Sequence, residues 1–138
     1  MIRPLPLAAI LAASALGGAA LADTPAERAR AAAGEILFEQ KCRICHSANP
    51  ETPSYGPSLV NVVGRAAGSY PDYDYSIALE ASGIVWTPEA LRAWMANNDG
   101  FMPGTKMRHV GVTDRAEQDF LVAYLESISQ RDPKEIQR

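Results

Sequence analysis

The sequence lacks any concentration of charge of one sign. Its 138 residues include 13 lysines and arginines against 16 aspartates and glutamates, interspersed along the chain, for a formal net charge of −3. Without a basic run the chain has no electrostatic footprint for nucleic acid, and we expect none to bind. It also lacks an internal repeat and a convincing strand pattern, which argues against solenoids and sheet proteins. A hydrophobic content of 47% then favours one helical globular domain.

Long apolar runs are absent beyond the N-terminus. There, Arg3 precedes an alanine- and leucine-rich stretch over residues 5–21, and Ala20-Leu21-Ala22 fits a signal peptidase site. This pattern predicts a signal peptide over residues 1–22, a mature domain over 23–138 and export to the periplasm. An uncleaved membrane anchor is the alternative, but the stretch barely reaches the roughly 20 apolar residues that a span needs. We therefore expect no stable membrane insertion.

Helical patterns occur at four places, separated by one long irregular segment. Residues 48–73 are rich in proline, glycine, serine and asparagine, which interrupt regular elements. A loop of this length is unusual in so small a domain, so we expect a large buried cofactor to organise it. The expected helices run over residues 26–43, over 75–81, from an N-cap at Thr87 to before Gly100, and from Thr113 or Asp114 to beyond Ile128.

The only two cysteines fall in one motif, Cys42-Arg43-Ile44-Cys45-His46. C-x-x-C-H is the attachment sequence of c-type haem. On a helical turn, residues three and four apart share a face, so both thiols can reach one porphyrin while His46 reaches its iron. A redox dithiol, a structural disulfide and a zinc half-site are alternatives, but no βαβ pattern is present and His109 is the only other imidazole. The motif predicts one covalently attached haem c.

Three methionines of the mature chain are candidates for a sixth ligand to the haem iron, a role in which a thioether raises the reduction potential. Met95 lies in a predicted helix beside Trp94, which favours a place in the core. Met102 and Met107 bracket the turn Pro103-Gly104-Thr105-Lys106, from which a thioether could be offered. The residues themselves leave the choice between these two open.

From Gly34 to about Ser129, the chain resembles the class I, mitochondrial-type cytochromes c and their small soluble bacterial relatives. Gly34 and Phe38 resemble the family's first helix, and Gly56-Pro57 resembles the loop that supports the histidine. Pro103-Gly104-Thr105-Lys106-Met107 resembles the family's methionine loop over its whole length.

The resemblance implies a cytochrome c domain over 23–138. Its fold would be all-α, with four to five short helices and long loops around one covalent haem, and with the first and last helices crossing. The iron would be held by His46 and Met107, with Met102 packing nearby. Pro57 would support His46, whose second ring nitrogen should donate to a backbone carbonyl. The haem propionates would be bound by Arg65, Tyr75 and Trp86.

The sequence also departs from the family. Trp94 stands where relatives usually place a tyrosine near the methionine sulfur, and Leu79 stands where many have a buried asparagine. An indole donates only through its single N–H, so the bond to the thioether is open to loss or rearrangement. The acidic balance contrasts with the basic mitochondrial proteins, although four cations near the expected haem edge could steer an acidic partner. They are Lys41, Arg43, Lys106 and Arg108.

These features together predict a monomeric, diffusible carrier that passes single electrons between redox partner proteins and is not an enzyme. The sequence does not identify the donor or the acceptor. One alternative is the haem subunit of a periplasmic dehydrogenase complex. Another is a ligand-binding haem protein with a labile sixth ligand, which would bind carbon monoxide rapidly when reduced.

Overall fold

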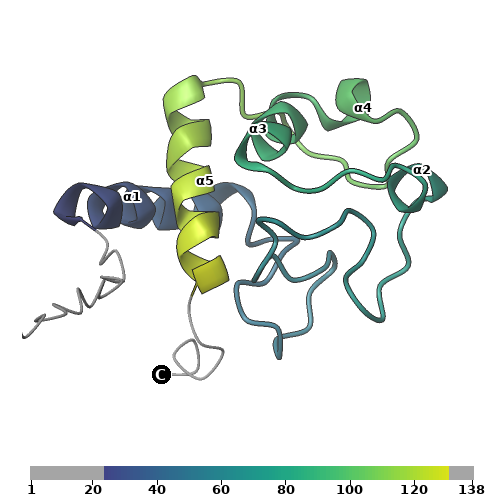
Figure 1. Cartoon of the computed structure of the whole chain (residues 1–138), viewed down its shortest axis with the longest axis horizontal. Coiled ribbons are helices and arrows are strands. Elements are labelled where there is room, and N and C mark those ends of the chain that lie inside the picture. The colour runs from purple at the N-terminus through teal and green to yellow at the C-terminus, as the bar shows by residue number, and fades with distance from the viewer. Residues whose placement is uncertain (1–23, 131–138) are drawn as a thin grey trace, which may run out of the picture.

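Residues 24–130 form an all-helical structure in the computed structural model, and nothing is described of the residues on either side (Figure 1). The expected signal peptide, 1–22, therefore lies outside the described residues. Within them the only β contact is an isolated bridge between Ala66 and Val85. The all-α prediction with four to five helices is confirmed. The helices are α1 (Pro25–Lys41), α2 (Ile77–Glu80), α3 (Pro88–Ala96), α4 (Asn98–Phe101) and α5 (Arg115–Gln130).

Helix α1 begins at a capping box. The Thr24 hydroxyl accepts from the Glu27 N–H, and the Glu27 carboxylate accepts from the Thr24 N–H, which satisfies two amides of the first turn. The helix ends at Lys41, two residues earlier than expected, and Cys42 caps it by donating its N–H to the Phe38 carbonyl at 2.8 Å. The site motif therefore follows α1 instead of lying in it.

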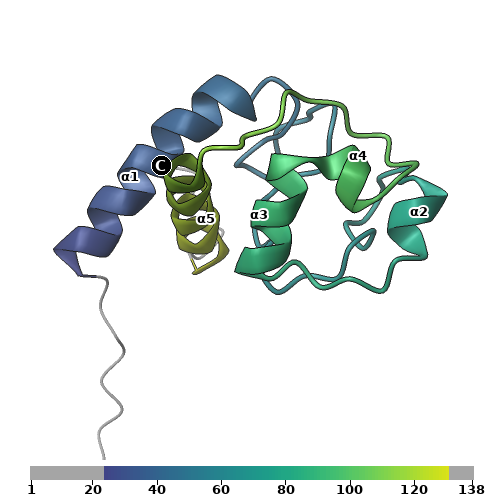
Figure 2. The same ribbon diagram turned by 90° about the horizontal axis from the view of Figure 1, so that it is seen from above.

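Helices α1 and α5 cross closely and make the most extensive helix contact of the described structure (Figures 1 and 2). Gly34 lies at the crossing, where a Cβ atom would overlap the Phe120 carbonyl oxygen and come within 2.8 Å of the Tyr124 Cβ. The rings of Phe38 and Tyr124 pack at 5.2 Å between centroids, and Phe38 is fully buried. The predicted crossing of the first and last helices is confirmed, and the missing side chain of Gly34 permits it.

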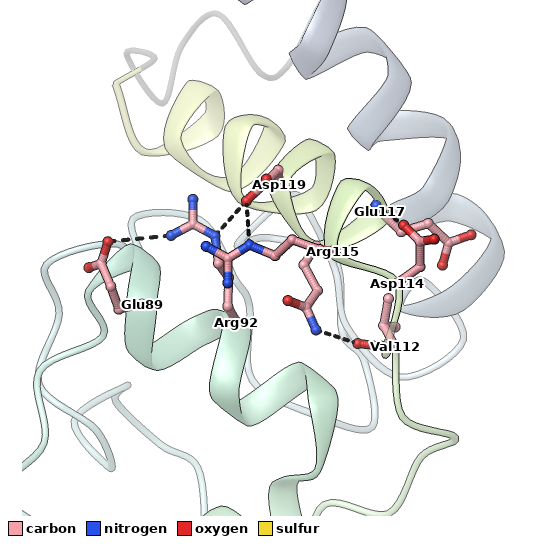
Figure 3. A network of polar contacts seen from close by, with 8 residues as sticks. Glu89, Arg92, Val112, Asp114, Arg115, Glu117 and Asp119 are labelled. Atoms are coloured by element: carbon pink, nitrogen blue, oxygen red, sulfur yellow. Dashed lines mark hydrogen bonds and ion pairs between the residues drawn. The ribbon is translucent and has the colours of Figure 1, made fainter.

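A polar network fixes α3 against α5 (Figure 3). Asp119 of α5 accepts from Arg92 Nε of α3 at 2.7 Å and pairs with Arg115 at 3.4 Å. At the start of α5, Asp114 accepts from the Glu117 N–H at 3.0 Å, as the capping-box spacing predicts. The Glu117 carboxylate pairs instead with Lys41 at 3.1 Å, so the α5 start is also bound to the end of α1.

The helix expected from Thr87 to before Gly100 is divided in two, and this part of the prediction is wrong. Thr87 and Pro88 begin α3 as expected, but the backbone leaves the helical region at Asn97, with φ −161° and ψ 87°. The Asn97 side chain then caps α4 by accepting from the Gly100 N–H at 2.9 Å. Gly100 lies within α4, and the break lets Asn98 turn its side chain into the interior.

The long segment between α1 and α2 is ordered by its own hydrogen bonds. The buried Ser47 carbonyl accepts from the Leu59 N–H at 3.1 Å and the Ser58 hydroxyl at 3.3 Å. Val60 and Val62 of the same segment are buried in the hydrophobic core. The segment is therefore an ordered loop that contributes side chains to the hydrophobic core.

Replacing Gly34 with Ala should destabilise the protein by about 1–3 kcal/mol, because the new methyl group meets backbone at the helix crossing. The free energy of unfolding from denaturant titration measures this. Ala32→Gly at an exposed position of α1 is the control, since it reports helix propensity alone. If Gly34→Ala instead stabilises the protein by the roughly 1 kcal/mol that propensity offers, the crossing is not as close as described.

Candidate haem site

The C-x-x-C-H motif forms a tight turn at the end of α1. The Cys42 carbonyl accepts from the Cys45 N–H at 3.0 Å and from the His46 N–H at 2.9 Å. Such a turn places both cysteines on one side, and each is half-buried. Ile44, between them, points outward and is 88% exposed.

The thiols do not resemble a redox-active pair. Burial raises the pKa of Cys42 to about 11, although the charge of Lys41 opposes the rise, whereas redox dithiols have a nucleophilic cysteine of lowered pKa. Neither cysteine forms a disulfide. Over residues 24–130, no three His, Cys, Asp or Glu side chains gather as a metal-binding group, so zinc finds no complete ligand set there. The alternatives to haem attachment thus gain no support.

His46 is fixed in orientation and is only 8% exposed. Its Nδ1 lies 2.8 Å from the Pro57 carbonyl oxygen, and since a carbonyl only accepts, Nδ1 carries the proton. Nε2 therefore holds the lone pair. Burial lowers the pKa of His46, the bond to Pro57 opposes this, and His109 and Arg65 lower it further. A neutral imidazole with a directed lone pair is the form that binds a metal.

Gly56 closes the space beside this imidazole. Its N–H donates to the Cys45 carbonyl at 2.6 Å, and a Cβ at this position would lie 2.6 Å from the His46 Cε1 atom. The Gly56-Pro57 pair therefore supports His46 in two ways, through a hydrogen bond and through close packing.

A second group of side chains surrounds a half-buried guanidinium. Arg65 donates to the carbonyls of Val60 and Ser58, each at 3.1 Å, and lies 5.1 Å from the ring centroid of Tyr70. Burial raises the pKa of Tyr75, and the charge of Arg65 opposes that rise, so these two groups lie close together. The result is a fixed cation beside a phenol, which suits a carboxylate ligand.

Trp86 belongs to the same part of the fold. Its backbone N–H donates to the Arg65 carbonyl at 2.9 Å, and its ring packs edge-on against Trp94 at 5.1 Å. The structure thus brings together Arg65, Tyr75 and Trp86, the three residues for which the family resemblance implies a role at the propionates.

Met107 is held at both its backbone and its sulfur. Trp94 Nε1 donates to the Met107 thioether sulfur at 3.1 Å, and Asn98 Nδ2 donates to the Met107 carbonyl at 2.6 Å. The hydrogen bond to the thioether, which the family resemblance left open to loss at Trp94, is therefore present and is donated by the indole N–H. Met95 and Met102 are buried in the core, whereas Met107 is only half-buried.

Two residues near the site were missed from the sequence. Asn98 was hidden because it fell inside a predicted helix, and only the break at Asn97 turns it towards Met107. His109 carried no motif, yet both of its ring nitrogens are buried without a hydrogen-bond partner among the described residues. Leu79, the second departure from the family, is buried in the core.

The four cations that were expected to form a docking patch are all paired. The partners lie within 3.1 Å: Glu117 for Lys41, Glu39 for Arg43, Asp74 for Lys106 and Asp99 for Arg108. Their positive charge is therefore compensated locally, and the hypothesis of a free basic patch gains no support.

These residues fit a covalent haem. The motif turn offers two thiols on one side, His46 offers a lone pair, and Met107 offers a thioether whose sulfur is already oriented. The orphan nitrogens of His109 also point to an interior group that the chain alone does not supply. A separate surface hollow of about 310 Å³, lined by residues of segments 50–58 and 70–73, contains none of these ligand candidates.

Comparisons with known proteins agree with this chemistry. The family model described as "Cytochrome c" matches residues 31–129. Cytochrome c2 of Rhodopila globiformis is 41% identical over 95 residues, covering 69% of this chain and 90% of that protein. Cytochrome c type-1 of Ascaris suum is 37% identical, covering 67% of this chain and 83% of that one. The solved structure of cytochrome cH from Methylobacterium extorquens is 41% identical with a TM-score of 0.65, covering 70% of this chain and 97% of its own.

Replacing Gly56 with Ala should push the His46 ring from its position, because the new methyl group would lie within 2.6 Å of it. We expect a loss of about 1–3 kcal/mol in stability and an altered ferric spin state, measured by unfolding and visible spectra. Gly64→Ala is the control, since it strains a positive φ but meets nothing within 4 Å. A Gly56→Ala spectrum identical to that of the unaltered protein would contradict the packing described.

Proposed function

Because the chain belongs to the cytochrome c family, we propose that it is a periplasmic one-electron carrier whose haem iron is held between His46 and Met107. It is a monohaem cytochrome c with one haem attached through Cys42 and Cys45, and it carries electrons rather than acting as an enzyme. The haem supplies the one-electron iron couple when bound. The observation that carries the proposal is the hydrogen bond from Trp94 to the Met107 sulfur.

The chain's own residues set the conditions for this transfer. On one side, Pro57 holds His46 in a single tautomer, so that its Nε2 lone pair keeps one direction. On the other side, Asn98 and Trp94 hold Met107. Ligands that are fixed in advance need little rearrangement when the iron changes its charge, and this favours fast electron transfer.

The Arg65 group has a separate role in the proposal. Arg65, Tyr75 and Trp86 would bind the haem propionates, with the guanidinium supplying the compensating charge. Arg65 is suited to this because three protein contacts, two carbonyls and the Tyr70 ring, hold it in place before any ligand binds. Burial lowers the pKa of Arg65, but a guanidinium stays protonated in proteins, so the cation persists.

Partner recognition would depend less on charge than in basic relatives. The cations of the expected edge are paired with acids. Two exposed apolar side chains flank the ligand segments: Ile44 is 88% exposed and Val110 is 92% exposed. The carrier would act as a monomer. It would contact an unidentified donor and an unidentified acceptor through the surface around Ile44 and Val110.

The same exposed side chains support one other candidate, the haem subunit of a periplasmic dehydrogenase complex. A fixed partner would cover Ile44 and Val110 permanently. Purification of the native protein distinguishes the two: a carrier elutes alone, and a subunit elutes with a larger enzyme. Within the described residues no helix has the length and hydropathy of a membrane span.

Replacing Met107 with Ala tests the ligand assignment. We expect the ferric holoprotein to lose the weak near-infrared charge-transfer band of methionine-ligated haem, and its reduction potential to fall, because the thioether favours the ferrous state. A redox titration followed by visible spectra measures both. Met102→Ala is the matched control and should keep the band. If Met102→Ala loses it instead, the methionine loop has been placed in the wrong register.

Replacing Trp94 with Phe tests the indole bond. The N–H withdraws electron density from the Met107 sulfur, so its loss should lower the potential. A hydrogen bond contributes a net free energy of about 0.5–1.5 kcal/mol, which for one electron corresponds to a decrease of roughly 20–65 mV in the reduction potential. Phe101→Leu is the control, because it removes a ring that packs on Trp94 at 6.1 Å but no donor. Equal potentials in Trp94→Phe and the unaltered protein would contradict this role.

A further inference from the structure

His109 has buried nitrogens and no partner for them. Among the described residues, its Nδ1 and Nε2 are the only buried side-chain nitrogen or oxygen atoms without a hydrogen bond. Leaving such a group unsatisfied costs about 1–3 kcal/mol, and buried polar atoms nearly always have a partner. An imidazole in this condition indicates a ligand that the polypeptide does not itself provide.

The side chain lies on the same side of its segment as Met107. Residues 107–112 form neither helix nor turn, and burial alternates over residues 107–110. Met107 and His109 are half-buried, while Arg108 and Val110 are exposed. This alternation is that of an extended chain, in which positions two apart face the same way.

His109 also lies near the proposed proximal ligand. Its charge is among the causes that lower the pKa of His46, after burial and the opposing bond to Pro57. The two imidazoles belong to segments more than sixty residues apart in the chain, so the fold has brought them together. Met107 and His109 thus share a side of the segment, and His109 lies within electrostatic reach of His46.

Residues before and after His109 are hydrogen-bonded to the rest of the fold, whereas the His109 side chain is not. Before it, Asn98 holds the Met107 carbonyl, and Arg108 pairs with Asp99 at 2.7 Å. After it, the Val112 N–H donates to the Met95 carbonyl at 2.8 Å. The imidazole is therefore tethered close to the Met107 position by a few residues of irregular chain.

We propose that His109 is a reserve sixth ligand, which binds the haem iron in place of Met107 when the thioether is lost. This rests on the proposed function, because it requires that Met107 is the normal ligand. In the exchange the His109 imidazole lone pair would replace the Met107 thioether as the donor, one iron–sulfur bond being broken for one iron–nitrogen bond formed, with no net transfer of electrons. With His46 and His109 as donors the site would stay closed to small molecules, and its reduction potential would fall because the methionine is gone.

The test uses ferric holoprotein of Met107→Ala with ¹⁵N-labelled histidine. The chain has only two histidines, so the number of histidine nitrogens coupled to the iron by electron–nuclear double resonance identifies the ligands without a second mutation. We expect two coupled imidazoles and a low-spin iron. One coupled imidazole and a high-spin iron would overturn the reserve ligand while leaving Met107 as the normal one.

A second measurement removes His109. Ferrous Met107→Ala/His109→Phe should bind carbon monoxide at least about tenfold faster than ferrous Met107→Ala, because no imidazole has to be displaced. Equal rates would contradict the proposal.

Met107→Ala/Lys106→Ala is the matched control, since Lys106 is the other nitrogen donor next to the ligand loop. If this control binds carbon monoxide faster than Met107→Ala does, the replacement ligand is the lysine and the proposal is wrong. If Met107→Ala keeps its near-infrared band, both the proposed ligand and its reserve are wrong.

Discussion

The hydrogen bond between His46 and the Pro57 carbonyl connects the two parts of the molecule on which the site depends. It joins the turn at the end of α1 to the long segment that follows, and it decides which ring nitrogen keeps a lone pair. The turn itself is placed by the α1–α5 crossing, which is as close as it is because Gly34 has no side chain. A helix crossing with no chemistry of its own therefore determines where the cysteines and the histidine meet the cofactor.

At Met107 the structure has an indole donor where the family resemblance places a tyrosine. A tyrosine hydroxyl can donate and accept, whereas the Trp94 indole only donates, and it donates to the Met107 sulfur. Trp94 is itself packed edge-on between Trp86 and Phe101, so its N–H has little freedom to turn away. Met107 packs against the hydrophobic core, so its thioether has one defined polar contact in largely apolar surroundings.

The charges on the surface differ from those of a basic carrier. Each cation at the expected edge is balanced by an acid, and exposed ion pairs of this kind contribute little to stability, about 0–1 kcal/mol. Their effect is on association: a compensated surface produces weak long-range steering. Contact through exposed side chains such as Ile44 and Val110 then matters more than charge.

The sequence by itself determined the cofactor, the fold class and most of the helices, because these depend on local order: C-x-x-C-H spacing, caps at Thr87 and Asp114, and apolar periodicity. Only the tertiary structure decided what depends on distant neighbours. The indole bond to Met107 and the ion pairs of Lys41 with Glu117 and of Lys106 with Asp74 join segments whose approach no local pattern encodes. The break at Asn97 likewise interrupts a helical pattern that the sequence continues. His109 is the clearest case, because an isolated histidine has no motif, and it became informative only when the fold buried its nitrogens beside the ligands without giving them a partner.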